Sequence, residues 1–243
     1  MKQLTEHVWI FPPDKDPNRV KPSVGVITTP TQTILIDAGN SPSHAREIHA
    51  ALQQMNMPPV SHIIYTHHHW DHIFGAKVFN VPVIAHLVCD FRTRKYAEHP
   101  WGVAHVARVI EDIPELRIGF SEIQRLMADE WDTWNIILPS IIIRPKKDRI
   151  QFDGITLEIE HIGGKHSDDS TLITVIEDGV MFLGDCFYPP PAFLRQPDDA
   201  LDSVPDYAML TSLLNRNHTW YVDGHSGAFK HSFWQTLIGM NKQ

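Results

Sequence analysis

The feature that most constrains this chain is a dense run of histidine and aspartate that follows a short apolar segment. Residues 61–66 (SHIIYT) predict a buried strand, and the sequence continues as HHHWDH. Residues two apart on an extended chain point to the same side, so His67 and His69 can bind one ion together. The turn into a following helix would direct Asp71 and His72 toward a second ion. One zinc ion needs about three protein ligands, and this loop offers more, which favours a site for two metals.

Composition narrows the class of protein. The chain has 243 residues, of which 42% are hydrophobic and 21% charged, as in an ordinary globular protein and unlike a disordered or fibrous one. The net charge of −8 disfavours nucleic acid as a partner. The two cysteines, Cys89 and Cys186, cannot build a disulfide framework, and neither a signal peptide nor an apolar run of about 18 residues is evident. We therefore expect a cytoplasmic protein with a small-molecule substrate and no membrane partner.

The order of predicted elements indicates two similar halves around a helical segment. The first half has predicted strands at 7–11, 24–29, 33–37, 61–66 and 81–86, with a helix from about 42 to 56 and a short one near 73–79. The second has strands at 149–152, 155–162, 171–176, 180–184 and 219–222, with helices near 206–215 and 229–240. Between them, residues 87–134 lose strand character and are predicted to be a helical insertion, with one helix at about 121–132. Two facing sheets with helices outside would form one domain over 1–243.

Five short motifs resemble those of the metallo-β-lactamase superfamily, and they occur in the order typical of it. The first is HxHxDH, here His67-x-His69-x-Asp71-His72, followed by the usual glycine, Gly75. The others are the segments 35–39 (LIDAG), 164–167 (GKHS), 182–185 (FLGD) and 223–226 (DGHS). The resemblance extends over nearly the whole chain. It implies an α/β fold, a four-layer αβ/βα sandwich of two facing mixed β-sheets with helices outside.

Carried over residue by residue, the resemblance implies a pair of zinc ions, with iron or manganese as alternatives. The implied ligands are His67, His69 and His166 for one ion, Asp71, His72 and His225 for the other, and Asp185 as the bridge. Asp37 would accept a hydrogen bond from a ligand imidazole and so fix its orientation. His68, the middle histidine, is expected to point away from its neighbours, and Cys186 to be a buried neighbour of Asp185 rather than a ligand.

The chemistry that this site implies is hydrolysis. Two ions about 3.5 to 4 Å apart can share a hydroxide, and coordination lowers the pKa of bound water toward about 7. The hydroxide would attack a small-molecule ester, lactone, thioester or amide, and Asp71 would relay a proton to the leaving group. Tyr188 lies three residues after Asp185, a spacing that resembles the tyrosine with which the N-acyl homoserine lactonases of the superfamily bind the substrate carbonyl. Packing in the core is the other interpretation of Tyr188.

Several alternatives stay open. Persulfide dioxygenases are similar in motif and use one iron, and the superfamily also contains β-lactamases and phosphodiesterases or nucleases. A member that binds metal without catalysis is a further option, and a homodimer is possible. We expect the segments 87–134 and 189–205 to form the pocket walls, because insertions between motifs are where a shared scaffold varies its substrate. The aromatic residues that could line this pocket are Trp70, Trp101, Trp131, Trp134 and Phe193.

Overall fold

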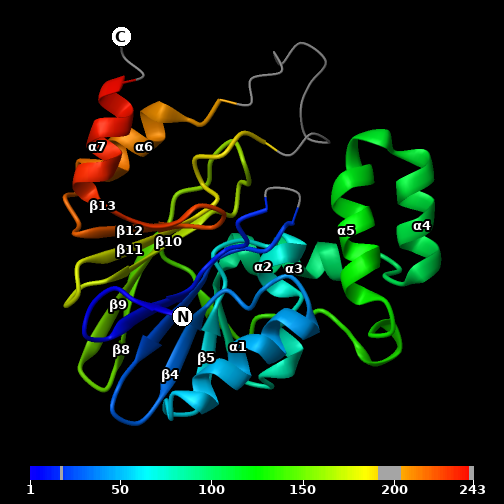
Figure 1. Ribbon diagram of the computed structural model, residues 1–243, viewed down its shortest axis with the longest axis horizontal. Helices are drawn as coiled ribbons and strands as arrows, with labels where there is room; N and C mark the ends of the chain where they lie inside the picture. The colour runs from blue at the N-terminus through cyan, green and yellow to red at the C-terminus, as the bar shows by residue number, and fades with distance from the viewer. Residues whose placement is uncertain (17–18, 191–203, 241–243) are drawn as a thin grey trace.

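Two mixed β-sheets lie face to face in the computed structural model, which describes residues 1–16, 19–190 and 204–240 (Figure 1). In that part of the chain, the first sheet has the strand order β1-β2-β3-β4-β5-β6-β7, antiparallel up to β4 and parallel from β4 onward. Its strands are β1 (Lys2–Gln3), β2 (Val8–Phe11), β3 (Val24–Thr28), β4 (Thr33–Ile36), β5 (Val60–Ile64), β6 (Val83–His86) and β7 (Ile141–Ile143).

The second sheet has the order β13-β12-β11-β10-β9-β8 among the described residues, and its one parallel pair there is β11 with β12. Its strands are β8 (Lys147–Phe152), β9 (Ile155–His161), β10 (Thr171–Val175), β11 (Val180–Gly184), β12 (Trp220–Asp223) and β13 (Gly227–Lys230). The helices are α1 (Pro42–Gln54), α2 (Trp70–Ile73), α3 (Leu87–Ala97), α4 (Val103–Asp112), α5 (Arg117–Met127), α6 (Tyr207–Leu214) and α7 (His231–Met240), with single 3-10 turns at 76–78, 114–116 and 131–133. No helix in the described ranges is long and apolar enough to cross a membrane.

The central strands, such as β3 and β4 of the first sheet and β10 and β11 of the second, bury both of their faces, and this explains why they are almost continuously apolar. On β4, Ile34 and Ile36 face the second sheet, whereas Leu35 belongs to the cluster that includes Ile48 and Leu52 of α1. The second sheet behaves in the same way, since its outward residues pack on α6 and α7. Alternate residues of a strand point to opposite faces, so a strand covered on both sides needs apolar residues throughout. The resulting order of layers is helices, sheet, sheet, helices.

The α/β sandwich expected from the sequence is thus confirmed, and most elements lie within a few residues of their predicted positions. The helix predicted from about 42 begins as expected, because the Ser41 hydroxyl accepts a hydrogen bond from the His44 amide (3.2 Å) and Pro42 occupies the first turn. Some details differ. Residues 229–230, predicted as the start of the last helix, belong to β13 because this segment pairs with β12. The helix predicted at 121–132 runs from Arg117 to Met127.

Helices α3, α4 and α5 occupy the segment between β6 and β7, where a helical insertion is predicted for 87–134. In Figure 1, α4 and α5 stand at the right, beside the sheets rather than on a sheet face. Only a few of their residues, such as Val106, Ile123 and Met127, join the core that lies behind the first sheet. That this segment is an insertion within a single domain spanning 1–243 stays a prediction.

Gly75 follows α2 and allows the loop of residues 67–72 to lie close to α1. A β-carbon at this position would overlap the carbonyl oxygen of Ala38 and lie 2.8 Å from the Ala45 Cβ. The Gly75 amide donates a hydrogen bond to the Gly39 carbonyl oxygen at 3.0 Å. A side chain at residue 75 would therefore push α2 away from the loop after β4.

We expect Gly75→Ala to lower the free energy of unfolding by about 1–3 kcal/mol, the usual cost of overpacking. The matched control is Gly119→Ala, where a β-carbon contacts no heavy atom within 4 Å and where alanine favours the helix by up to about 1 kcal/mol. Urea denaturation of the two variants and the natural protein measures both effects. Equal stability of all three proteins would contradict the close approach at Gly75.

Candidate metal centre

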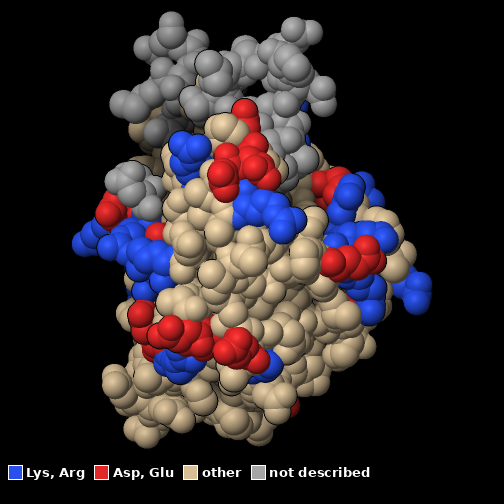
Figure 2. All heavy atoms as spheres, turned by 90° about the vertical axis from the view of Figure 1, so that its right-hand side faces the viewer, with Lys and Arg blue, Asp and Glu red and all other residues tan. Residues whose placement is uncertain are grey.

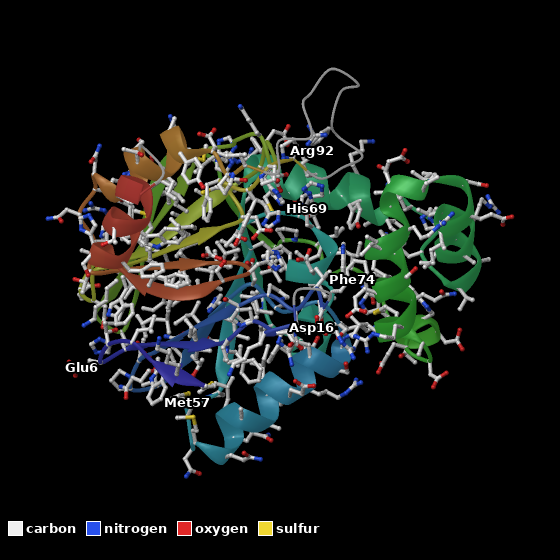
Figure 3. All side chains as sticks on the ribbon, turned by 45° about the horizontal axis from the view of Figure 1, so that its top comes forward. Glu6, Asp16, Met57, His69, Phe74 and Arg92 are labelled. Carbon is white, nitrogen blue, oxygen red and sulfur yellow. The ribbon has the colours of Figure 1, made fainter. Side chains whose placement is uncertain are left out.

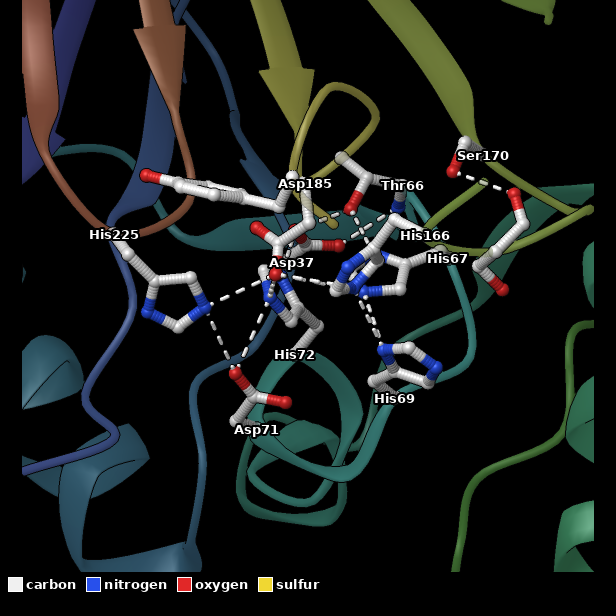
Figure 4. Close-up of polar contacts among 12 residues, drawn as sticks. Asp37, Thr66, His67, His69, Asp71, His72, His166, Ser170, Asp185 and His225 are labelled. Carbon is white, nitrogen blue, oxygen red and sulfur yellow. Dashed lines mark hydrogen bonds and ion pairs between the residues drawn. The ribbon is translucent and has the colours of Figure 1, made fainter. Parts of the chain in front are cut away.

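The side chains of all seven predicted ligands lie together at one edge of the sandwich (Figure 4). His67 and His69 follow the carboxyl end of β5, and Asp185 follows that of β11. The parallel pairs β4–β5 and β11–β12 bring these strand ends to the same edge. The ligand atoms form two groups, His67 with His69 and His166, and Asp71 with His72, Asp185 and His225, and within each group they lie within 4.8 Å of one another.

Three imidazole nitrogens converge in the first group. His69 Nδ1 lies 3.1 Å from His67 Nε2 and 3.0 Å from His166 Nε2. Three nitrogens that bind one zinc at 2.0–2.1 Å in tetrahedral geometry would be about 3.3 Å apart. The spacing therefore fits a single small cation in contact with all three rings.

The second group combines two imidazoles with two carboxylates. His225 Nε2 lies 3.3 Å from Asp71 Oδ2 and 3.0 Å from Asp185 Oδ2, and His72 Nε2 lies 3.4 and 3.5 Å from the same two oxygens. Asp185 Oδ2 is also 3.4 Å from His166 Nε2 in the first group. A single carboxylate oxygen thus stands between the two groups, as a bridging ligand must.

Hydrogen bonds from the protein orient three of the imidazoles. His72 Nδ1 lies 2.7 Å from Asp37 Oδ2, His67 Nδ1 lies 3.0 Å from Thr66 Oγ1, and His166 Nδ1 lies 3.1 Å from the Pro189 carbonyl oxygen. When Nδ1–H donates to such an oxygen, the lone pair of Nε2 is free for a metal. Asp37 therefore occupies the bracing position that the sequence predicts for it.

Burial and neighbouring charges set the protonation states of the ligand side chains. Burial lowers the pKa of His69 to about 3 and that of His67 well below its ordinary value, so both rings are neutral near pH 7. Burial alone would raise the pKa of Asp71 and Asp185, but the neighbouring histidines outweigh it and hold both carboxyl groups ionised. Neutral imidazoles and ionised carboxylates are the forms that bind a metal.

Unpartnered atoms supply a further test of whether these residues fit a cation. Two buried side-chain atoms of the second group have no hydrogen-bond partner among the described residues, namely His72 Nε2 and Asp185 Oδ1. A buried polar atom without a partner is costly, and buried carboxylates are costlier still unless a positive charge neutralises them. Gly224 leaves room for Asp185, because a β-carbon there would overlap Asp185 Oδ1. The donor set therefore suits one or two divalent ions.

Asp169 is a supporting residue that sequence reasoning missed. It is fully buried, and its Oδ2 accepts a hydrogen bond from the His68 amide at 2.8 Å and lies 3.1 Å from His68 Nδ1. The Ser167 hydroxyl donates to its other oxygen. Through its contacts with His68 and Ser167, this carboxylate connects the loop that carries His67 to the loop that carries His166. The only sequence signal is its position three residues after His166.

Tyr188 lies beside the site and turns its hydroxyl away from the first group. The hydroxyl donates to Asp223 Oδ1 at 3.0 Å and lies 3.0 Å from the Ser226 hydroxyl. Asp223 Oδ1 also accepts hydrogen bonds from the His225 and Ser226 amides, so this network positions the turn that carries His225. A contact of Tyr188 with substrate stays a prediction. Cys186 and Cys89 are buried free cysteines.

A cavity of about 690 Å³ opens from the metal centre toward α4 and α5. His69, Asp71, His166, Asp185 and His225 line one end of it. Trp70 and Trp101 also line it, whereas Trp131 and Trp134 do not. All four are partly buried against the core behind the first sheet. In Figure 3, His69 and Arg92 lie between the sheets and the α4–α5 pair. The predicted contributions of Phe193 and of most of the segment 189–205 lie outside the described residues.

Comparison with known proteins gives the class. The family model described as the metallo-beta-lactamase superfamily matches residues 17–216. The chain therefore belongs to the metallo-beta-lactamase superfamily.

Relatives in this superfamily include alkylsulfatases and β-lactamases. A linear primary-alkylsulfatase from Pseudomonas sp. is 37% identical over 98 residues, which are 40% of this chain and 18% of that protein. A metallo-beta-lactamase from Pontibacter korlensis has a TM-score of 0.65 at 17% identity, over 100% of this chain and 98% of that chain. The stereoselective inverting sec-alkylsulfatase Pisa1 from Pseudomonas sp. has a TM-score of 0.62 at 17% identity, over 95% of this chain and 40% of that chain. The chain thus spans less than half of either alkylsulfatase, and the structural likenesses show the fold.

Because Asp169 is buried against His68, we expect the folded protein to lose stability at acid pH. Burial tends to raise the pKa of Asp169, but its hydrogen bonds and charge interactions with His68, together with Ser167, hold that pKa well below its ordinary value. A carboxyl group whose pKa is lower in the folded state contributes stability above its unfolded pKa of about 3.9, and that contribution is lost as the pH falls.

We expect Asp169→Asn to lower the free energy of unfolding at pH 7 by about 1–3 kcal/mol, the order expected for hydrogen bonds to a buried charged group. The difference from the natural protein should shrink as the pH falls below about 4, since the natural carboxyl group is then losing its advantage. Urea denaturation from pH 7 to pH 3.5 measures it. Asp168→Asn is the control, because that half-exposed neighbour pairs with Arg92 at the surface and should cost less than about 1 kcal/mol. A deficit that does not change with pH would contradict the role of Asp169.

Proposed function

We propose that this chain is a metal-dependent hydrolase of a small-molecule ester, lactone, thioester or amide, and that it works with a pair of zinc ions. Members of this superfamily are mostly hydrolases. The observation that carries the proposal is Asp185 Oδ2, which lies within 3.5 Å of nitrogen atoms from both ligand groups, at His166, His72 and His225. Such a shared carboxylate suits a centre with two ions. Iron and manganese are the alternative metals.

The residues that would hold the metals are those of the two groups, His67, His69 and His166, and Asp71, His72 and His225, with Asp185 between them. When bound, divalent ions would polarise the substrate oxygen and lower the pKa of a water molecule toward about 7. Asp37, Thr66 and the Pro189 carbonyl keep three of the imidazoles in the required tautomer, so these groups act by holding protons at Nδ1.

Asp71 is the residue that we propose as proton relay. Its Oδ2 contacts His72 and His225, and the residue also lines the cavity, so its carboxyl group faces both the ligands and the substrate. Its lowered pKa keeps it ionised before the reaction, which lets it accept a proton and deliver it to the leaving group. Tyr188 is proposed to bind the substrate carbonyl, which requires that its hydroxyl leave Asp223 when substrate binds.

Sulfate-ester hydrolysis is a second candidate, and the 37% identity with a linear primary-alkylsulfatase over 98 residues favours it. Carboxylic esters and sulfate esters can be assayed side by side, so one panel that contains both kinds of substrate distinguishes the two candidate functions. The cytoplasmic location and the absence of nucleic-acid and membrane partners stay predictions, as does the possible homodimer.

We expect His69→Ala and Asp185→Ala each to lower kcat/KM on the substrates that the natural protein hydrolyses by at least about a hundredfold, the order of loss when a group that stabilises charge is removed. Both variants should also hold less metal in elemental analysis, and circular dichroism should show that they remain folded. The matched control is His49→Ala, an exposed histidine of α1 that belongs to neither ligand group. Full activity in either ligand variant would refute the site assignment.

Metal analysis and substrate assays of the same protein preparation distinguish the alternative functions. About two zinc ions per chain with turnover of an ester, lactone, thioester or amide supports the proposal, whereas turnover of sulfate esters alone supports the second candidate. One iron per chain with oxygen consumption indicates an enzyme similar to persulfide dioxygenases. Turnover restricted to β-lactams or phosphodiesters indicates those branches of the superfamily, and metal binding without any turnover indicates a non-catalytic member.

A further inference from the structure

The cavity beside the metal centre continues well beyond the space that a reacting ester group needs. Its volume of about 690 Å³ falls in the range of about 300–1,000 Å³ that is typical of sites for drug-sized ligands. From the ligand end it passes Trp70, Tyr96 and Trp101, and it ends against the helices α4 and α5. The part of a substrate that is not hydrolysed must occupy this space.

The far part of the cavity extends along α4. Three lining residues of the α4 segment, His105, Val109 and Ile113, are four residues apart, so they form one stripe along the helix and its end. Eight residues at 1.5 Å each make this stripe about 12 Å long. Leu116 and Phe120, also four apart, line the cavity from the α5 side. An extended chain advances about 3.5 Å over three bonds, so about 12 Å accommodates about ten bonds.

The wall of this far part is largely apolar. Trp101 stacks on Phe120 with ring centroids 6.0 Å apart and the ring of His105 lies 5.5 Å from Trp101, while Val109, Ile113 and Leu116 continue the surface. The charged residues Arg92, Lys95 and Glu115 also line the cavity, where Arg92 pairs with Asp168 and Lys95 with Glu98. Figure 2 views the molecule from the side of α4 and α5, where uncharged residues fill the centre and charged ones gather around it.

We propose that the substrate is an ester that carries an unbranched apolar chain of up to about ten bonds, and that this chain lies along the α4 stripe while the ester group reaches the metal centre. The proposal rests on the proposed hydrolase function. In the reaction, water oxygen bonds to the acyl carbon and the acyl C–O bond breaks. One water proton goes to the leaving alcohol, and the carboxylic acid product releases the other at neutral pH. The chain itself is unchanged and serves binding.

The first experiment measures kcat/KM of the zinc-loaded protein for methyl esters of straight-chain acids from two to twelve carbons, and for acetates of the matching alcohols. We expect kcat/KM to rise about fourfold for each methylene buried, as the usual free energy of burying a CH₂ requires, and to stop rising near ten carbons. The two series tell whether the acyl or the alcohol side carries the chain. Equal kcat/KM for short and long chains in both series would overturn the proposal while leaving the hydrolase function in place.

The second experiment fills the cavity. Gly119 lines it between Leu116 and Phe120, and a β-carbon there contacts nothing within 4 Å, so Gly119→Leu places bulk in the open space without a clash in the fold. Exclusion of two methylenes should lower kcat/KM for the ten-carbon substrate about sixteenfold and leave the two-carbon substrate within about twofold. Ser121→Leu, on the same helix but exposed and outside the cavity lining, is the control and should change neither value. A proportional loss on both substrates, or no loss on either, would contradict the proposal.

Direct binding keeps the inference testable if no ester, lactone, thioester or amide is hydrolysed, an outcome that would instead refute the proposed function. Calorimetric titration with decanoate and with decanol, each compared with its four-carbon counterpart, requires no turnover. Tighter binding of a ten-carbon ligand that Gly119→Leu weakens and Ser121→Leu does not would support the chain site. Equal binding of short and long ligands would overturn it.

Discussion

The site depends first on one buried carboxylate, that of Asp37 at the end of β4. It accepts hydrogen bonds from the Thr66 amide (2.8 Å) and hydroxyl (2.7 Å), and lies 2.7 Å from His72 Nδ1. Its backbone has φ of 62°, a left-handed conformation that aspartate tolerates better than most residues. With this turn the Asp37 amide still bonds to the Ile64 carbonyl of β5, while the side chain reaches α2. One residue thus joins two strand ends to the helix that carries Asp71 and His72. Without the Asp37 carboxylate, the Thr66 amide, the Thr66 hydroxyl and His72 Nδ1 would lose their hydrogen-bond acceptor.

The second constraint is charge. Asp71 and Asp185 are buried side by side and both stay ionised, an arrangement that hydrophobic packing alone would not support. The same carboxylates raise the pKa of His225 to about 10 despite its burial, so the second group attracts positive charge in the form of protons or of a metal ion. A cation that enters must release those protons, which couples metal affinity to pH. The first group differs, since burial keeps His67 and His69 neutral. The two groups are therefore prepared for metal by different physical means.

Much of this architecture follows from local patterns. The HHHWDH run, the strand endings around Asp37 and Asp185, and the continuous apolar strands all have a short-range signal, and the structure brings those predicted site residues to one edge. What the sequence could not indicate depends on contacts between distant segments. Asp169 looks like one of several surface acids, and only the fold places it on the His68 amide, 101 residues away. Likewise, residues 227–230 are a strand because β12 lies next to them, and Tyr188 turns toward Asp223 because of the turn that carries His225.

The two ends of the cavity obey different requirements. At the metal end, ligand atoms have to be placed to within a few tenths of an ångström, and strand ends joined by buried hydrogen bonds can do this. At the far end, a binding surface needs only volume and apolar side chains, and α4 and α5 supply these with little attachment to the sheets. Gly119 illustrates the difference. It costs the helix about 1 kcal/mol relative to alanine, yet its backbone has no positive φ and no neighbour crowds it. Neither helix geometry nor packing accounts for a glycine there, whereas a cavity that must stay open along α5 does.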